Sequence, residues 1–289
     1  MFNLLKLDDL STKQVIDIIK EANTLSKKKI VKQFKNKIVA NLFFENSTRT
    51  HYSFLVAEEK LGCKPIDFSV SSSSINKGET FHDTIKTFAS FGIDALVIRD
   101  VHNEWYQQLK DIKIPIINAG DGTANHPTQT LLDLLTIYQD FKKFKGLTIL
   151  IVGDIIHSRV AHSNIKIMKR LGMNVLLSAP KEFQDPQYEY IGFEEGIKKA
   201  DVINLLRIQN ERLTEQMHIS IQEYNKLYGM TMNRVTLMKP KSIIIHPAPF
   251  NRGIEIDNEV VECKQSRIFK QMNNGVYIRM IVLSMILSN

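Results

Sequence analysis

The sequence of 289 residues contains only two cysteines, Cys63 and Cys263. Two cysteines do not indicate a disulfide framework, and neither stands at the spacing of a metal-binding motif. A reducing compartment, the cytoplasm, is therefore the expected location. No metal and no other cofactor is expected.

Long apolar runs are also missing. No run approaches the roughly 20 residues that span a bilayer, and the N-terminal segment is acidic where a signal peptide is basic. The apolar C-terminal run 280–287 is too short to span a membrane and predicts a buried helix. Neither a P-loop nor a glycine-rich dinucleotide motif is present. These absences argue against membrane, secreted and nucleotide-binding proteins.

Positive charge is in excess, with 38 Lys and Arg against 31 Asp and Glu, a net charge of +7. Such an excess fits nucleic acid, an anionic surface or small anionic substrates. The only dense basic run, 27–29, closes a helical stretch, where the helix dipole favours solvated cations. Several single arginines stand in turn-like segments instead, which favours small anions and argues against a nucleic-acid partner.

Short apolar runs alternate with segments of helical periodicity, a pattern typical of parallel sheets covered by helices on both faces. The runs of strand length are 37–44, 95–98, 114–117, 148–152, 175–177, 202–206 and 243–245. The helical segments are 11–27, 47–61, 80–91, 128–141, 160–171, 192–199 and 275–287. The predicted fold class is α/β, with two domains that each hold a parallel β-sheet flanked by helices.

The expected domain boundary lies at the long helix 128–142, which ends just before a new strand. We expect a first domain of residues 1–135 and a second of residues 136–273. The final helix, about 274–289, is expected to return to the first domain, because chain termini are often close together. Ligands of open parallel sheets bind at the carboxyl ends of the strands, so the residues after each apolar run are the candidates.

The first candidate segment, Glu45–Thr50, follows the first strand and opens a helix. The first N–H groups of a helix have no helical partner, and the helix dipole favours anions there. Hydroxyls of Ser47, Thr48 and Thr50 add donors, and Arg49 offers a planar fork suited to phosphate. A Ser47 N-cap beside a solvated arginine explains the local pattern equally well.

Two further strand ends carry candidate residues. Arg99 follows the run 95–98, and the run 114–117 leads through a Gly-Asp-Gly loop to His126-Pro-Thr-Gln129. The residue before a proline is kept extended, so His126 is held at the mouth of a helix rather than inside it. A single histidine is more often structural, but the combined segment is a far more specific signal.

The segment Phe43–Thr50 resembles the carbamoyl-phosphate signature of the aspartate and ornithine carbamoyltransferases, and the segment around His126 matches the same family. The resemblance extends from about Leu5 to Ile286. It implies that Arg49, Thr50, Arg99 and His126 are catalytic. The implied carbamoyl-phosphate ligands are Ser47, Thr48, Arg49, Thr50, Ser74, Arg99, His126, Gln129, Ala248 and Pro249. The X-Pro bond at Pro249 allows a cis peptide there.

Composition alone predicts a flexible loop for the serine-rich segment 71–79. In the family, this region resembles a loop that enters the active site of a neighbouring subunit, where a serine and a lysine meet the ligand. Lys77 fits the lysine, and Ser74 is the expected serine, with Ser73 as the alternative. The resemblance therefore implies a homotrimer with shared active sites. It is also compatible with a regulatory chain or a pathway enzyme as a partner.

Three later segments bear on the second substrate. L-Aspartate carries two carboxylates, which call for guanidinium partners, and the resemblance assigns its binding to Lys77, Arg159, Arg207 and Gln209. The segment 246–249 lacks the cysteine that ornithine enzymes carry. The sequence thus favours transfer of the carbamoyl group of carbamoyl phosphate to L-aspartate, an early step of pyrimidine biosynthesis.

Five residues depart from the family pattern: His51, Asp100, Asn125, Ile156 and Phe250. An acid at position 100, beside Arg99, is expected to lower the local positive potential. Two other interpretations stay open, a carbamoyltransferase for ornithine or a related amine, and a non-catalytic anion-binding paralogue. A paralogue of that kind would be expected to have lost Arg49, Arg99, His126 or Lys77, and all four are present.

Overall fold

The computed structural model describes residues 2–28, 32–70, 73–122, 124–208 and 220–288. The chain divides into two compact units, Met1–Leu135 with Asn273–Asn289, and Thr136–Met272. Each unit is built on a four-stranded sheet, and all strand pairs in both sheets are parallel. The predicted α/β fold class is confirmed.

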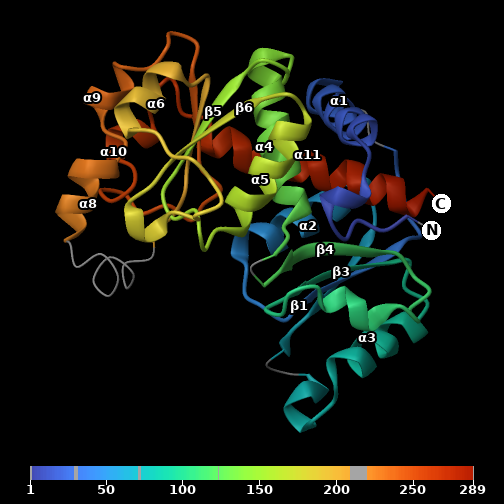
Figure 1. The fold of residues 1–289 in the computed structure, drawn as a ribbon. Helices are drawn as coiled ribbons and strands as arrows, with labels where there is room; N and C mark the ends of the chain where they lie inside the picture. The colour runs from blue at the N-terminus through green and yellow to red at the C-terminus, as the bar shows by residue number, and fades with distance from the viewer. Residues whose placement is uncertain (1, 29–31, 71–72, 123, 209–219, 289) are drawn as a thin grey trace. The chain divides into compact units, whose positions relative to one another are not determined.

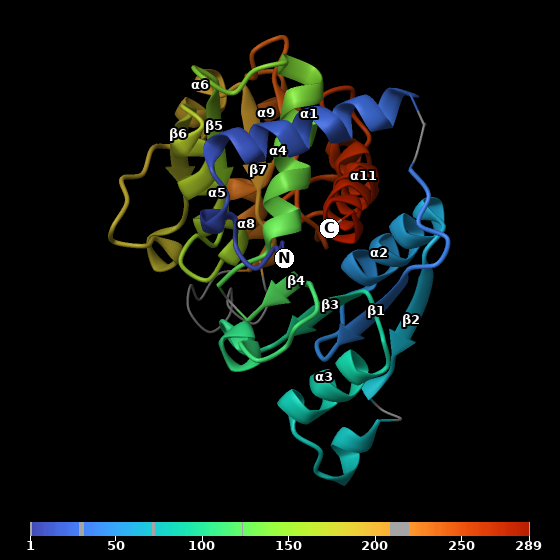
Figure 2. The same cartoon turned by 90° about the vertical axis from the view of Figure 1, so that its right-hand side faces the viewer.

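The sheet of the first unit has the strand order β2-β1-β3-β4. Its strands are β1 (Ile38–Phe43), β2 (Lys64–Phe68), β3 (Ala95–Asp100) and β4 (Ile116–Asp121). Helix α2 (Thr48–Leu61) lies on one side of this sheet and α3 (Phe81–Ser90) on the other (Figures 1 and 2). The register pairs Phe43 with Arg99, so the segments that follow β1 and β3 leave the same edge of the sheet.

Helix α1 (Thr12–Lys28) begins with a reciprocal cap. The Ser11 N–H donates to Gln14 Oε1 at 2.9 Å, and the Gln14 N–H donates to Ser11 Oγ at 3.2 Å. This arrangement is a capping box, in which each residue accepts the backbone N–H of the other. The unit also contains the short 3-10 helices η1 (Leu7–Asp9), η3 (Ser74–Lys77) and η4 (Trp105–Leu109).

The last helix, α11 (Ile268–Leu287), returns to the first unit as expected, and Lys32 Nζ lies 2.9 Å from Ser288 Oγ just past its end. Its predicted start near Gly275 is wrong, because the helix begins two turns earlier. Glycine is a poor helix former, which is why it suggests a boundary. Here it lies inside the helix, where a Cβ would stand 2.3 Å from Arg279 Nη1.

The second unit has the strand order β6-β5-β7-β8. Its strands are β5 (Thr148–Val152), β6 (Asn174–Ser178), β7 (Val202–Leu205) and β8 (Ile243–Ile245). Its helical elements are α5 (Arg159–Arg170), η5 (Lys181–Phe183), α6 (Phe193–Lys199), α8 (Ile221–Tyr228), α9 (Met232–Val235) and α10 (Asn258–Val261). Helices α4 (Pro127–Phe141) and α11 both cross the division between the units.

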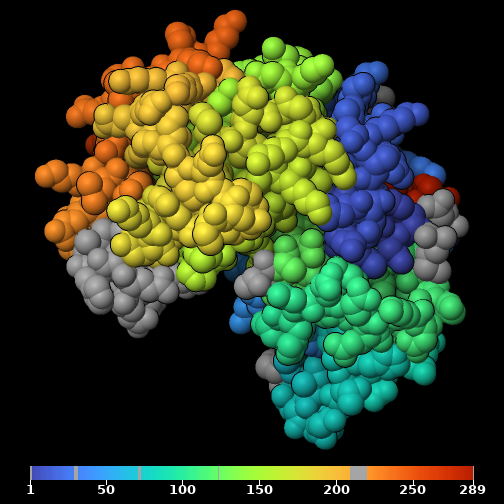
Figure 3. Space-filling model, in the orientation of Figure 1, coloured from blue at the N-terminus to red at the C-terminus, as the bar shows by residue number. Residues whose placement is uncertain are grey.

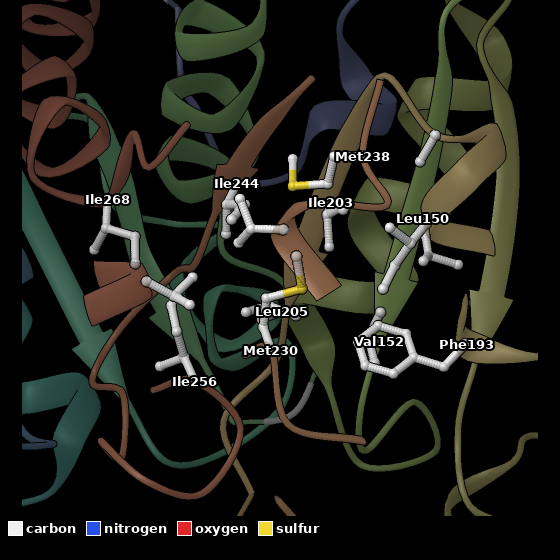
Figure 4. Packing of buried hydrophobic residues seen from close by; sticks show 14 of the residues in the cluster. Leu150, Val152, Phe193, Ile203, Leu205, Met230, Met238, Ile244, Ile256 and Ile268 are labelled. Carbon is white, nitrogen blue, oxygen red and sulfur yellow. The ribbon is translucent and has the colours of Figure 1, made fainter. Parts of the chain in front are cut away.

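Each unit has its own apolar core. In the first unit, Leu42, Leu96 and Ile98 of the strands pack with Ile85 and Trp105. In the second, strand residues such as Leu150, Ile203 and Ile244 pack with side chains from the helices and loops, including Phe193 and Met230 (Figure 4). Two separate cores fix two rigid sheets whose carboxyl edges present the loops described below.

Apolar runs do not indicate every element. Strand β2 lies at a sheet edge and has no buried residue, so its sequence is not an apolar run. Helices α8, α9 and α10 have only eight, four and four residues, which is too short for a helical periodicity to predict them. Within the described residues, no helix combines the length and apolar character needed to cross a bilayer.

Candidate functional site

The N-terminus of α2, which follows β1, differs from that of four other α-helices that begin at a hydroxyl residue. Ser47 occupies the N-cap of α2 in an extended conformation, yet its side chain makes no capping hydrogen bond. Hydroxyls do accept the expected backbone N–H at the caps Thr80, Ser158, Ser220 and Thr231. The Ser47 hydroxyl therefore does not serve as a cap, which favours the anion-site interpretation over the N-cap alternative.

The next three residues form the first turn of α2. Thr48 and Arg49 are exposed, whereas Thr50 is buried. Helix geometry places the N–H groups of this turn at the open end of the helix, together with two side chains that remain accessible. The segment thus provides hydroxyl, guanidinium and backbone donors for an anion.

Thr50 and His126 meet at this point. Thr50 Oγ1 lies 3.4 Å from His126 Nε2, and both side chains are buried. His126 directly precedes Pro127, the first residue of α4, as the sequence predicts. Two helix N-termini are therefore joined by a hydroxyl and an imidazole, groups that can donate to an oxygen that gains negative charge.

Arg99 ends in the same region and is held from two sides. Its Nη2 lies 2.8 Å from Glu45 Oε2, and its Nη1 donates to the Ala119 carbonyl at 3.2 Å. The Arg99 side chain is 7% exposed. Gly120 has φ +135°, and a Cβ there would stand 2.6 Å from Arg99 Nη1. The position of the Arg99 guanidinium therefore depends on a glycine at residue 120.

Glu45 holds the Arg99 guanidinium but is not among the predicted site residues, although it stands two positions before Ser47. The signal for it is that an acid directly after a strand, in a segment expected to bind anions, needs a cationic partner. The strand register supplies one, because Phe43 pairs with Arg99 and the Phe44 N–H donates to the Arg99 carbonyl at 2.8 Å.

The loop that leads to His126 is organised by a buried acid. Asp121 is fully buried, and its carboxylate accepts from the Asn125 N–H and, at 3.2 Å, from the Glu104 N–H. Gln129, on the first turn of α4, is also buried and donates through Nε2 to Asp133 Oδ1 at 2.9 Å. Polar contacts therefore fix both flanks of His126.

Asp100 does not neutralise Arg99 in the direct way that its position suggests. The Asp100 carboxylate accepts from the backbone N–H of His102 at 2.8 Å and lies 2.6 Å from His102 Nδ1. The Arg99 guanidinium is paired with Glu45 instead. Arg99 is thus paired with Glu45, whereas Asp100 is held by His102.

Ser74 and Lys77 lie on η3, and both are exposed. The segment around 74–90 forms part of the molecular surface in Figure 3, coloured teal. Within the described part of the chain, neither side chain has a hydrogen bond or an ion pair, whereas Ser73 Oγ donates to the Val70 carbonyl at 2.8 Å. The alternative serine is thus already engaged within its own chain, which favours Ser74.

In the second unit, three segments meet at the carboxyl edge of the sheet. The Leu206 N–H donates to the Val152 carbonyl, and Asn251 Nδ2 donates to the Ile208 carbonyl, each at 2.8 Å. Half-buried Arg159 is the first residue of α5, and exposed Arg207 follows β7. Gln209, the remaining predicted ligand, lies outside the described residues.

The turn at Ala248 and Pro249 contains a cis peptide bond, which agrees with the expectation for this X-Pro pair. Buried His246 holds the turn, because its Nδ1 accepts the Ala248 N–H at 2.9 Å. Its Nε2 lies 3.2 Å from Glu255 Oε1, so the imidazole proton is on Nε2 and is donated to that carboxylate. Glu255 Oε1 also accepts the Asn251 N–H at 2.6 Å, which ties the turn into one network.

The first unit combines an anion site with hydrogen-bond donors for a carbonyl oxygen. Helix N-termini and two arginines favour phosphate, while Thr50, Arg99 and His126 supply donors that could polarise a carbonyl oxygen. Among the described residues, no group of three or more His, Cys, Asp and Glu side chains is arranged to hold a metal ion.

Comparisons with known proteins agree along the whole chain. Residues 3–139 match the family described as "Aspartate/ornithine carbamoyltransferase, carbamoyl-P binding domain", and residues 145–286 match the "Asp/Orn binding domain" of the same family. The aspartate carbamoyltransferase catalytic subunit of Staphylococcus saprophyticus is 49% identical over 99% of this chain and 97% of that protein. The corresponding Fusobacterium nucleatum subunit is 48% identical over 99% of this chain and 96% of that protein.

Solved structures give the same answer. The aspartate transcarbamoylase of Trypanosoma cruzi, in complex with N-(phosphonacetyl)-L-aspartic acid, superposes with a TM-score of 0.89 at 31% identity, over 97% of this chain and 94% of that one. The catalytic subunit of M. jannaschii aspartate transcarbamoylase has a TM-score of 0.88 at 32% identity, over 100% and 98% of the two chains. The chain therefore belongs to the aspartate/ornithine carbamoyltransferase family.

Proposed function

We propose that this protein transfers the carbamoyl group of carbamoyl phosphate to the amino group of L-aspartate, giving N-carbamoyl-L-aspartate and phosphate. The observation that carries the proposal is the approach of Thr50 and His126 to 3.4 Å beside the N-terminus of α2, whose Ser47 hydroxyl makes no cap. The names of the relatives and of the solved structures support aspartate as the second substrate.

In this mechanism the phosphate group of carbamoyl phosphate binds Ser47, Thr48, Arg49 and Thr50, together with Ser74 of a neighbouring subunit. Thr50, Arg99 and His126 donate to the carbamoyl oxygen. Gln129 and the backbone at Ala248 and Pro249 orient the carbamoyl amide, so that its carbon is presented to the incoming amine.

The aspartate amine attacks the carbamoyl carbon, and a tetrahedral intermediate with a negatively charged oxygen forms. The bond to the phosphate oxygen then breaks, and the leaving phosphate accepts the proton that the amine loses. The donors around the oxygen lower the barrier because they are already oriented before the charge appears. No covalent enzyme intermediate and no dedicated general base are required.

Aspartate binding is assigned to Arg159, Arg207 and Gln209, with Lys77 from the neighbouring subunit. Two guanidinium groups match the two carboxylates of aspartate, which is the reason to prefer it over ornithine. The domain roles follow, with residues 1–135 and the last helix binding carbamoyl phosphate and residues 136–273 binding aspartate. We further propose that the protein is a cytoplasmic homotrimer that acts in pyrimidine biosynthesis.

Product analysis tests the reaction. The purified chain is incubated with carbamoyl phosphate and either aspartate or ornithine, and the carbamoylated product is identified by chromatography and mass. We expect N-carbamoyl-L-aspartate and no citrulline. Citrulline as the main product would assign the chain to ornithine, and no product with either amine would leave a non-catalytic anion-binding protein.

A further inference from the structure

Arg279 on α11 is a buried cation that has no counter-ion in the described part of the chain. The residue is 3% exposed, and among the described residues no carboxylate forms an ion pair with it. Its Nε is buried and has no hydrogen-bond partner within the described ranges. A buried charge that lacks an ionic partner is costly, so it needs a structural or functional reason.

The contacts of Arg279 lie on the two helices that open at the anion site. Its Nη2 lies 3.4 Å from Thr128 Oγ1, and its guanidinium lies 5.0 Å from the centroid of the Phe54 ring. Thr128 is two residues after His126 at the start of α4, and Phe54 is four residues after Thr50 on α2. One side chain therefore contacts both of the helices that bring Thr50 and His126 together.

Gly275 shows that the position of the guanidinium is built into α11. A glycine inside a helix weakens it relative to alanine. At this position, a Cβ would approach Arg279 Nη1 to 2.3 Å, one turn along the same helix. The helix thus accepts an unfavourable residue where the space is needed by the arginine one turn later.

Charge links Arg279 to the site as well. Burial and the nearby positive charge of Arg99 lower the pKa of Arg279 to about 9, so the group remains protonated at neutral pH. Glu45 is paired with Arg99 and offsets part of the positive charge there. No carboxylate of the described residues offsets the charge of Arg279 in this way, so it adds to the potential that an arriving phosphate experiences.

We infer that Arg279 is a positioning residue of the carbamoyl-phosphate site, which fixes the starts of α2 and α4 and supplies an unneutralised positive charge behind Arg99. The inference rests on the proposed function. Arg279 itself does not touch the reacting atoms. Its planar guanidinium holds Thr128 and Phe54 in position. Its charge makes the electrostatic potential at the site more positive.

Two substitutions at Arg279 separate the effect of the guanidinium contacts from the effect of the positive charge. Arg279→Met keeps the length of the side chain and removes the charge, so we expect the Kd of inorganic phosphate to rise about tenfold and kcat to fall about tenfold. Arg279→Lys keeps the charge but loses the planar guanidinium and its two contacts. We therefore expect the phosphate affinity to stay within about threefold of wild type while kcat still falls. The KM for aspartate should change little in both variants.

Arg252→Met serves as the matched control, because Arg252 is exposed and pairs with Glu262 at 2.7 Å. We expect unchanged phosphate affinity and kcat for it. Folded Arg279→Met protein with wild-type phosphate affinity and kcat, or equal phosphate affinities in the Met and Lys variants, overturns the inference.

If Arg279→Met does not fold, Thr128→Val and Gly275→Ala replace it. Thr128→Val removes only the hydrogen-bond partner and should lower kcat with phosphate affinity retained. Gly275→Ala favours the helix but displaces the guanidinium, so kcat should fall without loss of helical content. Normal kcat in both variants rejects the positioning role. Phosphate binding is measured directly, so the charge effect is tested even if the wild-type chain fails to carbamoylate aspartate.

Discussion

Thr50 Oγ1 lies 3.4 Å from His126 Nε2, although 76 positions of sequence separate the two residues. Thr50 belongs to the first turn of α2, and His126 directly precedes α4. The contact therefore joins two helix N-termini, where unpaired N–H groups and the helix dipole both favour negative charge. It also explains why both side chains are buried although each is polar.

Thr50→Val tests the contribution of the hydroxyl. Valine has nearly the same shape, so the fold should persist while one donor to the developing oxyanion is lost. We expect kcat to fall about 100-fold, the effect typical of one such donor. Steady-state kinetics with carbamoyl phosphate and aspartate measure it.

The control is Ser53→Ala on the same helix, because Ser53 Oγ only donates to the Thr50 carbonyl within the helix, at 2.9 Å. Its activity should stay close to wild type. A Thr50→Val protein with normal kcat would show that the hydroxyl does not act on the transition state.

Gly120→Ala should disturb Arg99 without altering any charged group. The new Cβ would stand 2.6 Å from Arg99 Nη1, and φ of +135° is unfavourable for alanine. We expect kcat/KM for carbamoyl phosphate to fall at least about tenfold, because a displacement of about 1 Å can cost more than that. Gly192→Ala is the matched control, because its Cβ would meet only Glu195 Cβ at 4.0 Å and φ is not positive. Equal losses in both variants would mean a general stability effect.

Arg207→Gln should separate the two substrates. Arg207 is exposed after β7 and is assigned to an aspartate carboxylate. We expect the KM for aspartate to rise at least about tenfold, since a charge-assisted hydrogen bond contributes about 1.5–3 kcal/mol. The Kd of phosphate, measured by calorimetry, should not change. A weaker affinity for phosphate with an unchanged KM for aspartate would reverse the assignment of the two units.

Mixed oligomers test the shared site. Arg49→Ala and Lys77→Ala chains should each be nearly inactive, because Arg49 and Lys77 are assigned to the same site from different chains. Random reassembly of a symmetric trimer from equal amounts would restore roughly a quarter of the sites. Dissociation, mixing and refolding followed by the activity assay measures this recovery.

The control mixture combines Arg49→Ala with Thr50→Val, two lesions in the part of the site that one chain supplies, and it should recover nothing. Absence of recovery in the first mixture, with mixed oligomers confirmed by mass, would refute the shared site. A fully active monomer in light scattering would refute it as well.

Glu58 makes the stability of the fold depend on pH. Its side chain is fully buried on α2, where Asn41 Nδ2 donates to Oε2 at 2.8 Å. Burial raises its pKa from 4.5 to about 8. Between these two values the folded chain holds a proton that the unfolded chain has released. The free energy of unfolding should therefore fall as pH rises, by about 1.4 kcal/mol per unit, and level off above about pH 8.

Glu58→Gln removes this proton and keeps an acceptor for Asn41. The variant should gain stability relative to wild type as pH increases from 5 to 8, measured by urea unfolding at each pH. Glu59→Gln, next to it on the exposed face, should follow the wild-type curve. Parallel curves for Glu58→Gln and wild type would show that the buried carboxyl does not hold the proton.

The sequence by itself determined the fold class, the order of most strands and helices, and the segments that carry the chemistry. Apolar runs mark the buried strands because a parallel sheet is covered on both faces. Ser47–Thr50 and His126–Gln129 are identified because a strand end followed by a helix start is a local pattern, readable within a few residues.

Tertiary structure decided which of these segments meet and what holds them. The pairing of Phe43 with Arg99 brings Glu45 to the guanidinium. The sequence around Glu45 does not indicate that Arg99 is its partner. The start of α11 differs from expectation for the same reason, because Gly275 is explained by the Arg279 guanidinium and the Leu132 side chain that lie against it. Local periodicity reports which face of an element is buried, whereas contacts between distant segments depend on packing that no single segment encodes.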